Sequence, residues 1–408
     1  MALLLALALP LLMPYLTRVR AGGAPHPQLR LRARSAAPQR VMKTHTFGVA
    51  ASHTMVQLNQ PLAPAPMAET LVIVRTTMPM ASRRTFVGLG GRGVLAAAIS
   101  ASATGAIPVG LPGVGPRGNA LAETHYRSVD LGGLEIFYRE AGPAEAPVVL
   151  LLHGFPTSSR MFRNLIPMLA DTYRVIAPDY PAFGHSAVPS RSDFRYTHAH
   201  LSEAVEALNE KLGVTRFAMY AMDFGGPIGY RLMLKYPDRV TGIVLQNTPA
   251  FGEPTSGPLW AAELAYWKDG SSEHRDAVRY KLAPEAIRSQ YVAGTRDPSL
   301  IDPDNWTIDS ALLARAGVDE IMLDLLYDIR NNRQVVADAR QFFRAHPRQV
   351  MIATGVNDPL FPGESMKPPA DIPEIEFHPI DSGHFALEDH CAEIGSLTRG
   401  FLRRVMPA

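Results

Sequence analysis

The chain has 408 residues and is 47% hydrophobic, so it can bury a large core in one or more domains. Its formal net charge of +2 hides an uneven distribution: residues 1–122 contain twelve Lys/Arg and one acid, and the remainder contains 28 Lys/Arg and 37 Asp/Glu. That acidic body gives no electrostatic support for nucleic-acid binding, and a single cysteine, Cys391, excludes an intramolecular disulfide and a cysteine-based metal cluster.

The first 122 residues have the composition of a targeting region. Residues 82–88 read Ser-Arg-Arg-Thr-Phe-Val-Gly, an apolar Gly/Ala-rich stretch follows at 94–110, and Ala120-Leu121-Ala122 offers small residues for a signal peptidase. In this order the three parts resemble the twin-arginine export signal of bacteria. We therefore expect a signal peptide at 78–122, with Arg83 and Arg84 as the pair and cleavage near Ala122, and export to the periplasm or the cell exterior.

Residues 1–77 are then an over-extended reading of the gene or a disordered leader. The apolar run 2–16 could also be a secretory core, but no positive charge precedes it and it is short for a membrane span. An Arg-rich plant-type transit peptide would have a similar composition, and a cytoplasmic location is also compatible with the sequence. We expect no stable membrane span in the mature chain.

From residue 126 onward the pattern becomes that of a globular domain. Short apolar runs bounded by turn residues predict strands at 127–130, 134–140, 148–152, 173–178, 216–222, 240–247, 350–355 and 375–380. Helical patterns occur at 161–170, 197–212 and 225–236, and a closing helix is expected at 388–405. This alternation predicts an α/β fold with a mostly parallel, eight-stranded sheet that helices cover on both faces.

Residues 250–346 interrupt this rhythm between the sixth and seventh strands. The segment is rich in charged and aromatic residues and is mostly helical in pattern, with loops at 294–304. An insertion between strands of an α/β sheet lies near the carboxyl edge, where ligands bind. We expect a helical lid (cap) here on a core formed by 123–249 and 347–408, although the aromatic residues could equally form the lid's own core.

The segment 220–226, Tyr-Ala-Met-Asp-Phe-Gly-Gly, predicts a strand, a sharp turn and a helix. In an elbow of the G-x-S-x-G type the turn exposes a nucleophilic side chain, and small neighbours let strand and helix approach closely. Asp223 occupies the nucleophile position, where a carboxylate would attack carbon and become an alkyl ester. Taken alone, the motif also allows Asp223 to be only a helix N-cap.

A second segment, His153-Gly154-Phe155-Pro156, directly follows a buried strand. The Phe155 N–H can face the elbow there and form an oxyanion hole with the N–H of Phe224 at the helix N-terminus. His153 would support this loop, and structural support could be its only role.

Two further residues follow the last predicted strands. Asp358 lies in Gly355-Val356-Asn357-Asp358-Pro359, and His384 lies in Asp381-Ser382-Gly383-His384-Phe385. Asp358 could be an ordinary turn residue and His384 a helix cap. The chain order of Asp223, Asp358 and His384 is nevertheless that of nucleophile, acid and base in enzymes with this elbow. Because each residue follows a predicted strand, together they favour a catalytic triad.

The chain resembles the α/β-hydrolase superfamily, and within it the epoxide hydrolase and haloalkane dehalogenase branch. The resemblance covers about 126–402 and rests on residues 153–159 and 179–186, the Asp223 elbow, Asp358 and Gly383-His384. It implies a two-step hydrolysis without cofactor or metal: Asp223 attacks carbon, and His384, oriented by Asp358, activates the water that cleaves the ester. Ala182 and Ala221 stand where the family usually has glycine.

The leaving group decides between the two enzymes of this branch. Haloalkane dehalogenases hold halide with a Trp after the nucleophile and often an Asn after His-Gly, but this chain has Phe224 and Phe155, which lack donors. The His-Gly-Phe-Pro form is typical of epoxide hydrolases, which protonate the epoxide oxygen with lid tyrosines. Tyr266, Tyr291 and Tyr327 are the candidates, although Ile329 stands where the second tyrosine is usual.

The leading prediction is therefore hydrolysis of an epoxide to a vicinal diol, on a small, largely apolar electrophile. The chain could instead be a haloalkane or haloacid dehalogenase, another α/β hydrolase, or a non-catalytic ligand-binding protein on the same fold. We expect no metal site at His198-Ala199-His200, because residues two apart diverge on a helix and Thr197 has the features of an N-cap on a solvated helix start.

Overall fold

The fold is that of a computed structural model, which describes residues 122–252 and 258–407. The predicted leader, and the predicted signal peptide except for Ala122, lie outside the described residues. Within the two described ranges, no helix has the length and apolar character that crossing a membrane requires.

Eight strands form one sheet, in the order β1-β2-β4-β3-β5-β6-β7-β8. The strands β1 and β2 pair antiparallel, as do β2 and β4, and every later neighbour pairs in parallel. The predicted α/β class and mostly parallel eight-stranded sheet are therefore confirmed. The strands are β1 (Thr124–Asp130), β2 (Glu135–Ala141), β3 (Val148–Leu152), β4 (Arg174–Pro178), β5 (Phe217–Met222), β6 (Val240–Gln246), β7 (Val350–Gly355) and β8 (Glu376–Ile380).

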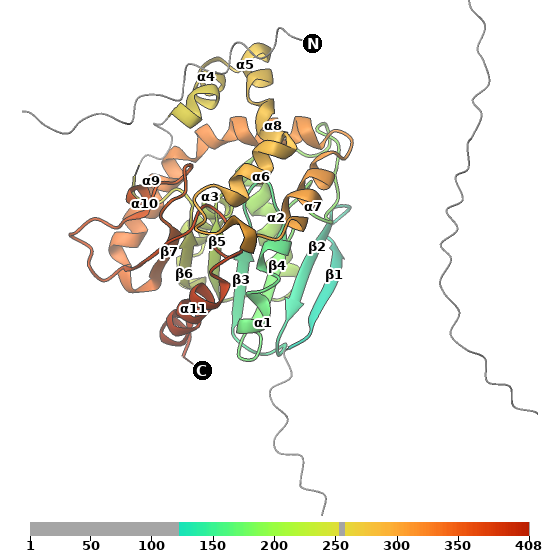
Figure 1. The fold of residues 1–408 in the computed structure, drawn as a ribbon. Helices are drawn as coiled ribbons and strands as arrows, with labels where there is room; N and C mark the ends of the chain where they lie inside the picture. The colour runs from blue at the N-terminus through green and yellow to red at the C-terminus, as the bar shows by residue number, and fades with distance from the viewer. Residues whose placement is uncertain (1–121, 253–257, 408) are drawn as a thin grey trace, which may run out of the picture. The chain divides into compact units, whose positions relative to one another are not determined.

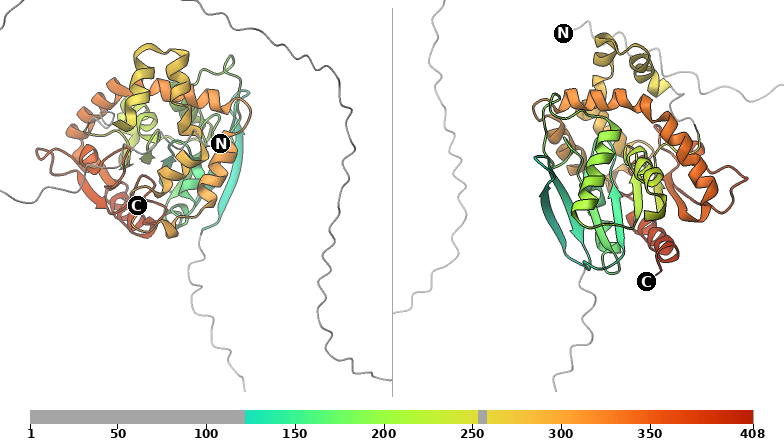
Figure 2. Two further views of the ribbon diagram at one scale, coloured as in Figure 1. Left: turned by 45° about the horizontal axis from the view of Figure 1, so that its top comes forward. Right: turned by 180° about the vertical axis from the view of Figure 1, so that it is seen from behind.

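The central strands are buried along their whole length. Every residue of β3, β5, β6 and β7 is buried, as expected for parallel strands that helices cover on both faces. The helices α1 (Ile166–Leu169) and α11 (Cys391–Val405) pack on one face, and α2 (His198–Lys211) and α3 (Gly225–Lys235) pack on the other (Figures 1 and 2). The sheet is thus the middle layer of three.

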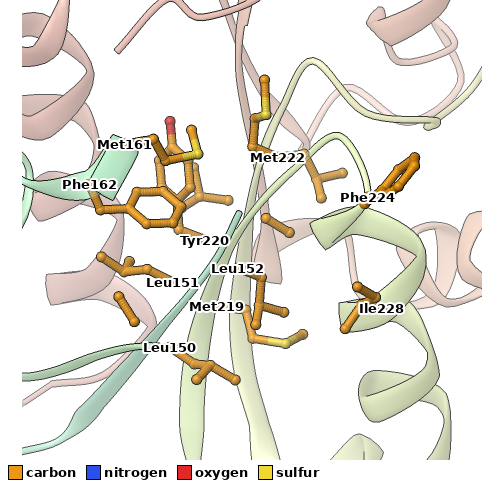
Figure 3. Packing of buried hydrophobic residues seen from close by; sticks show 14 of the residues in the cluster. Leu150, Leu151, Leu152, Met161, Phe162, Met219, Tyr220, Met222, Phe224 and Ile228 are labelled. Carbon is orange, nitrogen blue, oxygen red and sulfur yellow. The ribbon is translucent and has the colours of Figure 1, made fainter. Parts of the chain in front are cut away.

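The core continues across the sheet beside the predicted elbow. Figure 3 shows Leu150, Leu151 and Leu152 of β3 next to Met219 and Tyr220 of β5. On one side these strands meet the 3-10 helix η1 (Ser159–Phe162), where the ring of Phe162 contacts that of Tyr220 edge-on at 5.7 Å between centroids. On the other side they meet α3. The elbow that joins β5 to α3 therefore stands on a fully packed base.

The predicted helix at 161–170 is two shorter elements, η1 and α1. Pro167 lies in the first turn of α1, and it has no N–H to donate to the turn before it. A continuous helix through this segment would lose that bond, so the chain leaves η1 and begins α1 at Ile166. The short α10 (Gly363–Met366) follows β7, and two further 3-10 helices precede strands, η2 (Pro237–Arg239) and η8 (Pro347–Gln349).

Helices fill the connection between β6 and β7, here called the insertion (residues 250–346). Figure 1 shows α4 to α8 above one end of the sheet. The predicted loop at 294–304 is confirmed apart from one 3-10 turn, η6, and the first residue of α7. The elements are η4 (Pro258–Trp260), α4 (Ala261–Asp269), α5 (Ser272–Ala277), η5 (Arg279–Leu282), α6 (Pro284–Val292), η6 (Pro298–Leu300), α7 (Asp304–Leu313), α8 (Val318–Asp328), η7 (Ile329–Asn332) and α9 (Arg333–Ala345).

Candidate active site

Asp223 lies in the turn between β5 and α3, with a φ of +50°. A non-glycine residue costs about 1–2 kcal/mol in this left-handed region, so hydrogen bonds must hold it there. The Asp223 N–H donates to the Asn247 carbonyl at 3.1 Å, and the Thr248 hydroxyl donates to the Asp223 carbonyl at 2.7 Å. The N-cap residue of α3 is Phe224, so the Asp223 side chain does not cap this helix.

Close packing around the elbow requires small neighbours, as the sequence predicts. A Cβ atom on Gly225 would lie 2.2 Å from the Leu152 carbonyl oxygen. A Cβ atom on Gly154 would lie 2.4 Å from the Asp223 Cβ. Both distances are shorter than any real contact, so the loop after β3 can reach the carboxylate only because these residues are glycines.

Two backbone N–H groups bind the Asp223 carboxylate. The Phe155 N–H donates to Asp223 Oδ1 at 2.7 Å, and the Phe224 N–H also hydrogen-bonds the carboxylate. These are the two donors that the sequence predicts for an oxyanion hole. The Phe155 N–H holds Oδ1, and residue Asp223 as a whole is 8% exposed.

His384 lies between the two predicted carboxylates. Its Nδ1 is 2.7 Å from Asp358 Oδ2, and its Nε2 is 3.9 Å from Asp223 Oδ2. The Nε2 atom is buried and has no hydrogen-bond partner among the residues that the structure describes. When Nδ1–H donates to Asp358, Nε2 is therefore the free acceptor facing the elbow, at a distance too long for a direct hydrogen bond.

Asp358 is itself held by two donors. The Leu360 N–H donates to Oδ1 at 2.8 Å, and Asn247 Nδ2 donates to Oδ2 at 2.9 Å. Asn247 directly follows β6, has a φ of +40°, and also binds both backbone groups of Gly355 at 3.0 Å. Our sequence reasoning missed Asn247. The available signal was a polar residue directly after a parallel strand, at the same edge as Asp223 and Asp358.

The three side chains shift one another's protonation. Burial raises the pKa of Asp223 above its ordinary value, although His384 and the two N–H groups oppose the shift. Burial also acts on Asp358, but His384 and the hydrogen-bond donors outweigh it and lower the pKa of that carboxyl. For His384, burial lowers the pKa, yet Asp358 and Asp223 outweigh burial and raise it above the usual value. The site therefore favours an ionised Asp358 next to an imidazole that readily takes a proton.

His153 supports the loop that carries Phe155. Its ring stacks on Tyr180 at 4.1 Å between centroids, and its Nδ1 lies 3.0 Å from the Gly154 carbonyl oxygen. Burial lowers the pKa of His153 to about 4, so the ring is neutral near pH 7. It does not line the cavity described next.

A cavity of about 600 Å³ opens in front of the elbow, between the core and the insertion. Asp223, Asp358 and His384 line it together with Phe155 and Phe224. The insertion contributes apolar and aromatic wall residues, including Leu259, Trp260, Trp267, Tyr280, Leu326 and Ile329. The cavity also has polar wall residues, among them Lys281, Ser289, Gln290, Asn332 and three arginines. Trp260, Tyr280 and Lys281 were not anticipated in this wall from the sequence.

The three predicted tyrosines do not line this cavity. The Tyr266 hydroxyl accepts from Arg275 at 2.7 Å, and its ring packs on Tyr327 at 4.4 Å between centroids. The Tyr291 hydroxyl donates to Asp309 at 2.5 Å while its ring stacks on Phe385. The structure thus brings Asp223, Asp358 and His384 together, whereas Tyr266 and Tyr327 pack against each other within the insertion and Tyr291 packs against the core.

The predicted N-cap at Thr197 is confirmed, because its side chain accepts from the His200 N–H. His198, however, is not solvated as the sequence suggests. It is fully buried, and its Nδ1 lies 3.1 Å from Asp328 Oδ2 at the end of α8. No cluster of three or more metal-ligating side chains occurs within 122–252 and 258–407.

Comparisons with known proteins place this site in a family. A family model described as the alpha/beta hydrolase fold matches residues 147–390. An uncharacterized hydrolase of Saccharomyces cerevisiae is 38% identical over 282 residues, which are 68% of this chain and 96% of the yeast protein. A haloalkane dehalogenase of Psychrobacter cryohalolentis is 38% identical over 131 residues, which are 31% of this chain and 43% of that protein.

Among solved structures, an epoxide hydrolase from Vigna radiata matches with a TM-score of 0.53. The two chains are 22% identical, and the match covers 69% of this chain and 99% of the other, so it shows the fold alone. The family model covers more than half of the chain, and the curated relatives above are hydrolases. The chain therefore is an α/β-fold hydrolase and belongs to the α/β-hydrolase fold family.

Proposed function

We propose that the protein hydrolyses epoxides to vicinal diols through an alkyl ester of Asp223. One observation carries the proposal: Asp223 Oδ1 is bound by the Phe155 N–H at 2.7 Å, while Asp223 Oδ2 lies 3.9 Å from Nε2 of His384. One oxygen is thus held in place for a later negative charge, and the other is the nucleophile. A serine hydroxyl would need a base to take its proton, whereas this carboxylate attacks directly once it is ionised.

In the first step Asp223 Oδ2 attacks a ring carbon, and the bond from that carbon to the epoxide oxygen breaks. The product is an ester whose carbonyl oxygen is Oδ1, already beside the backbone donors. Because substrate and nucleophile share one cavity, the reaction gains from proximity without an ion or cofactor. The largely apolar and aromatic wall suits a small apolar electrophile.

In the second step water attacks the ester carbonyl carbon and gives its proton to His384 Nε2. The gap of 3.9 Å between Nε2 and Oδ2 is too long for a direct bond and leaves room for a water at an angle between them. Asp358 stabilises the imidazolium, and the N–H groups of Phe155 and Phe224 stabilise the negative charge on Oδ1. The tetrahedral intermediate then releases the diol, which takes its proton from His384.

A second candidate is the release of halide from a haloalkane or haloacid. The indole N–H of Trp260 favours it, because this donor is buried in the cavity wall and makes no hydrogen bond among the described residues. A halide could accept from such a donor. The Phe residues at 155 and 224 oppose this second candidate, since neither side chain can bind a halide.

A single turnover in water labelled with heavy oxygen tests the ester. With enzyme in excess, the new hydroxyl of the diol should carry ordinary oxygen from Asp223, and the peptide that contains Asp223 should gain the label. Label in the first-turnover diol and none in the peptide would show direct attack by water and would refute the ester mechanism.

A parallel screen decides between the two leaving groups. Purified protein beginning at Glu123 is offered a panel of small epoxides and haloalkanes, with epoxide consumption and halide release followed separately. Turnover of epoxides without halide release supports the leading proposal, and the reverse result supports dehalogenation. The Asp223→Asn variant serves as the control for uncatalysed reaction.

We also propose that the chain is exported through the pair Arg83 and Arg84. Its support is the order of motifs in the sequence: the arginine pair, the apolar stretch and the small residues up to Ala122. Replacing both arginines with lysine should stop export of the full chain in a bacterial host. Unchanged export of that variant would refute the proposal.

A further inference from the structure

A lysine and a glutamate form a buried ion pair in the wall of the cavity. Lys281 lies in η5 and lines the cavity with Asp223, and its side chain is 12% exposed. Glu263 lies in α4, its side chain is fully buried, and a carboxylate oxygen contacts the Lys281 ammonium group. The ammonium also lies 5.0 Å from the centre of the Trp260 ring. Lys281 thus brings the pair to the wall of the same cavity that the nucleophile lines.

Stability alone does not account for this arrangement. Removing two charges from water costs free energy that their attraction often fails to return, and apolar residues of similar volume usually serve a core equally well. Glu263 and Lys281 both belong to the insertion, so the pair does not join the insertion to the sheet. A buried ammonium group that lines a reaction cavity is better explained by contact with the substrate.

The net charge of the Lys281–Glu263 pair also suits a neutral substrate. Glu263 balances Lys281, so this part of the wall carries no net charge that would retain an anionic product. Burial lowers the pKa of Lys281 to about 8, with the Asp223 carboxylate opposing the shift. Lys281 is therefore mostly protonated at pH 7 and is a stronger acid than an ordinary lysine.

We infer that Lys281 is the acid that protonates the oxygen leaving the substrate, and that Glu263 is the positioning residue that holds its ammonium group toward the cavity. This inference rests on the proposed epoxide hydrolysis and assigns the role that Tyr266, Tyr291 and Tyr327 do not fill. The other cationic wall residues, Arg330, Arg333 and Arg340, cannot act in this way because a guanidinium does not release its proton.

The protons and electrons of both steps balance. As Asp223 Oδ2 bonds to carbon, the electron pair of the breaking carbon–oxygen bond moves to the epoxide oxygen, which takes a proton from Lys281 Nζ. The neutral amine then regains a proton from solvent water. His384 takes a proton from the attacking water and returns it to the second oxygen of the diol, while the other proton of that water leaves the Asp223 carboxyl group for solvent. Each turnover therefore consumes one epoxide and one water.

The test compares Lys281→Met with the wild type in two separate steps, ester formation and ester hydrolysis, by rapid quench and intact-protein mass. Lys268→Met is the matched control, because Lys268 is an exposed lysine of the same insertion, in α4, and does not line the cavity. We expect Lys281→Met to slow ester formation by an epoxide about 100-fold or more, the usual range for loss of a general acid. Ester hydrolysis should stay within about 2-fold, and Lys268→Met should change neither step by more than that.

The dependence of ester formation on pH gives a second readout. The charged groups around Lys281 are Glu263 from α4, Asp223 from the elbow and His384 after β8. Because Lys281 must carry its proton, the wild-type rate should fall as the pH rises through about 8. Lys281→Met should lose this decrease, and Glu263→Gln should move it to lower pH by removing the charge that favours the ammonium group.

Lys281→Arg keeps a cation beside Glu263 and serves if the methionine variant does not fold. It should also form the ester slowly and lose the decrease near pH 8, because arginine holds its proton. Equal slowing of both steps, or a decrease near pH 8 that persists in the variants, would overturn the inference. If wild-type protein forms no ester at all, the proposed function fails instead, and the two failures are thereby distinguished.

Discussion

The core and the insertion hold their polar side chains in the cavity in different ways. Asp223, Asp358 and His384 each follow the end of a parallel strand, β5, β7 and β8, and hydrogen bonds fix the first two to the backbone. Lys281 instead reaches the cavity from a 3-10 helix on a long side chain, and its partner Glu263 comes from another helix of the insertion. The core therefore sets the geometry of bond formation, while the insertion supplies groups whose place depends on how helices pack.

This difference has a chemical consequence. In the proposed mechanism the nucleophile, the base and the oxyanion donors must keep their positions through both steps, and each of them follows a strand of the sheet. The group that meets the leaving atom must suit one substrate class only. A change in the insertion can therefore alter the leaving group while the ester chemistry of the core remains.

The largest effect is expected at the elbow. Asp223→Asn removes the nucleophile, and turnover should fall by at least about 10⁴-fold, as when other nucleophiles are removed. Initial rates of diol formation provide the measurement. Asp238→Asn, at an exposed carboxylate in η2, is the control and should retain wild-type turnover. An Asp223→Asn enzyme that keeps a tenth of the activity would show that the core does not act through this carboxylate.

His384→Gln should separate the two steps of the core. Ester formation needs no base, whereas ester hydrolysis does, so turnover should fall by about 10³-fold while the ester accumulates. Intact-protein mass after an acid quench should then show enzyme heavier by one substrate molecule. The partly exposed His378→Gln on β8 should show no accumulation. If neither variant accumulates ester, His384 is not the base of the second step.

Asn247→Gly tests the role of Asn247, which holds Asp358 by a hydrogen bond. Glycine tolerates the φ of +40°, so the change removes the amide while the backbone can stay in place. Loss of a hydrogen bond to a charged group, about 1.5–3 kcal/mol, should slow ester hydrolysis by roughly 10-fold or more. Ester formation should be nearly unchanged. Slowing of the first step alone would contradict a role through Asp358 and His384.

The smallest effect concerns stability. Ala182 is buried with a φ of +69°, so Ala182→Gly should relieve strain and raise the free energy of unfolding by about 1 kcal/mol. Ala221 in β5 has no positive φ, and Ala221→Gly should lower that free energy by roughly 0.5–1 kcal/mol. Urea unfolding measures both. Equal destabilisation by the two changes would show that the φ of Ala182 is no source of strain.

The sequence predicted the strands, the elbow and the meeting of Asp223, Asp358 and His384 because the carboxyl ends of parallel strands share one edge of the sheet. To place each of these residues, it was enough to predict where the preceding strand ends. Asn247 follows the same rule and could have been found by it.

The insertion does not follow this rule. Whether Tyr266 or Tyr280 faces the cavity depends on the rotation of short helices against one another, and aromatic residues pack a helical core as readily as they line a pocket. Residue type alone pointed to the lid tyrosines, but the structure uses Tyr266 and Tyr327 to pack against each other. The sequence around Lys281 does not distinguish it from an exposed lysine. Only the position of Glu263 beside it in the fold indicates a buried ion pair.

The pair of His198 and Asp328 joins α2 of the core to the end of α8, and the His198 ring contacts that of Phe224 at 4.5 Å between centroids. Swinging the insertion away on this side would pull apart a buried hydrogen-bonded pair beside the elbow residue Phe224. An opening on another side would leave this pair intact. Leu259 and Tyr280 are 46% and 52% exposed and also line the cavity, so the cavity wall reaches the molecular surface at these two residues.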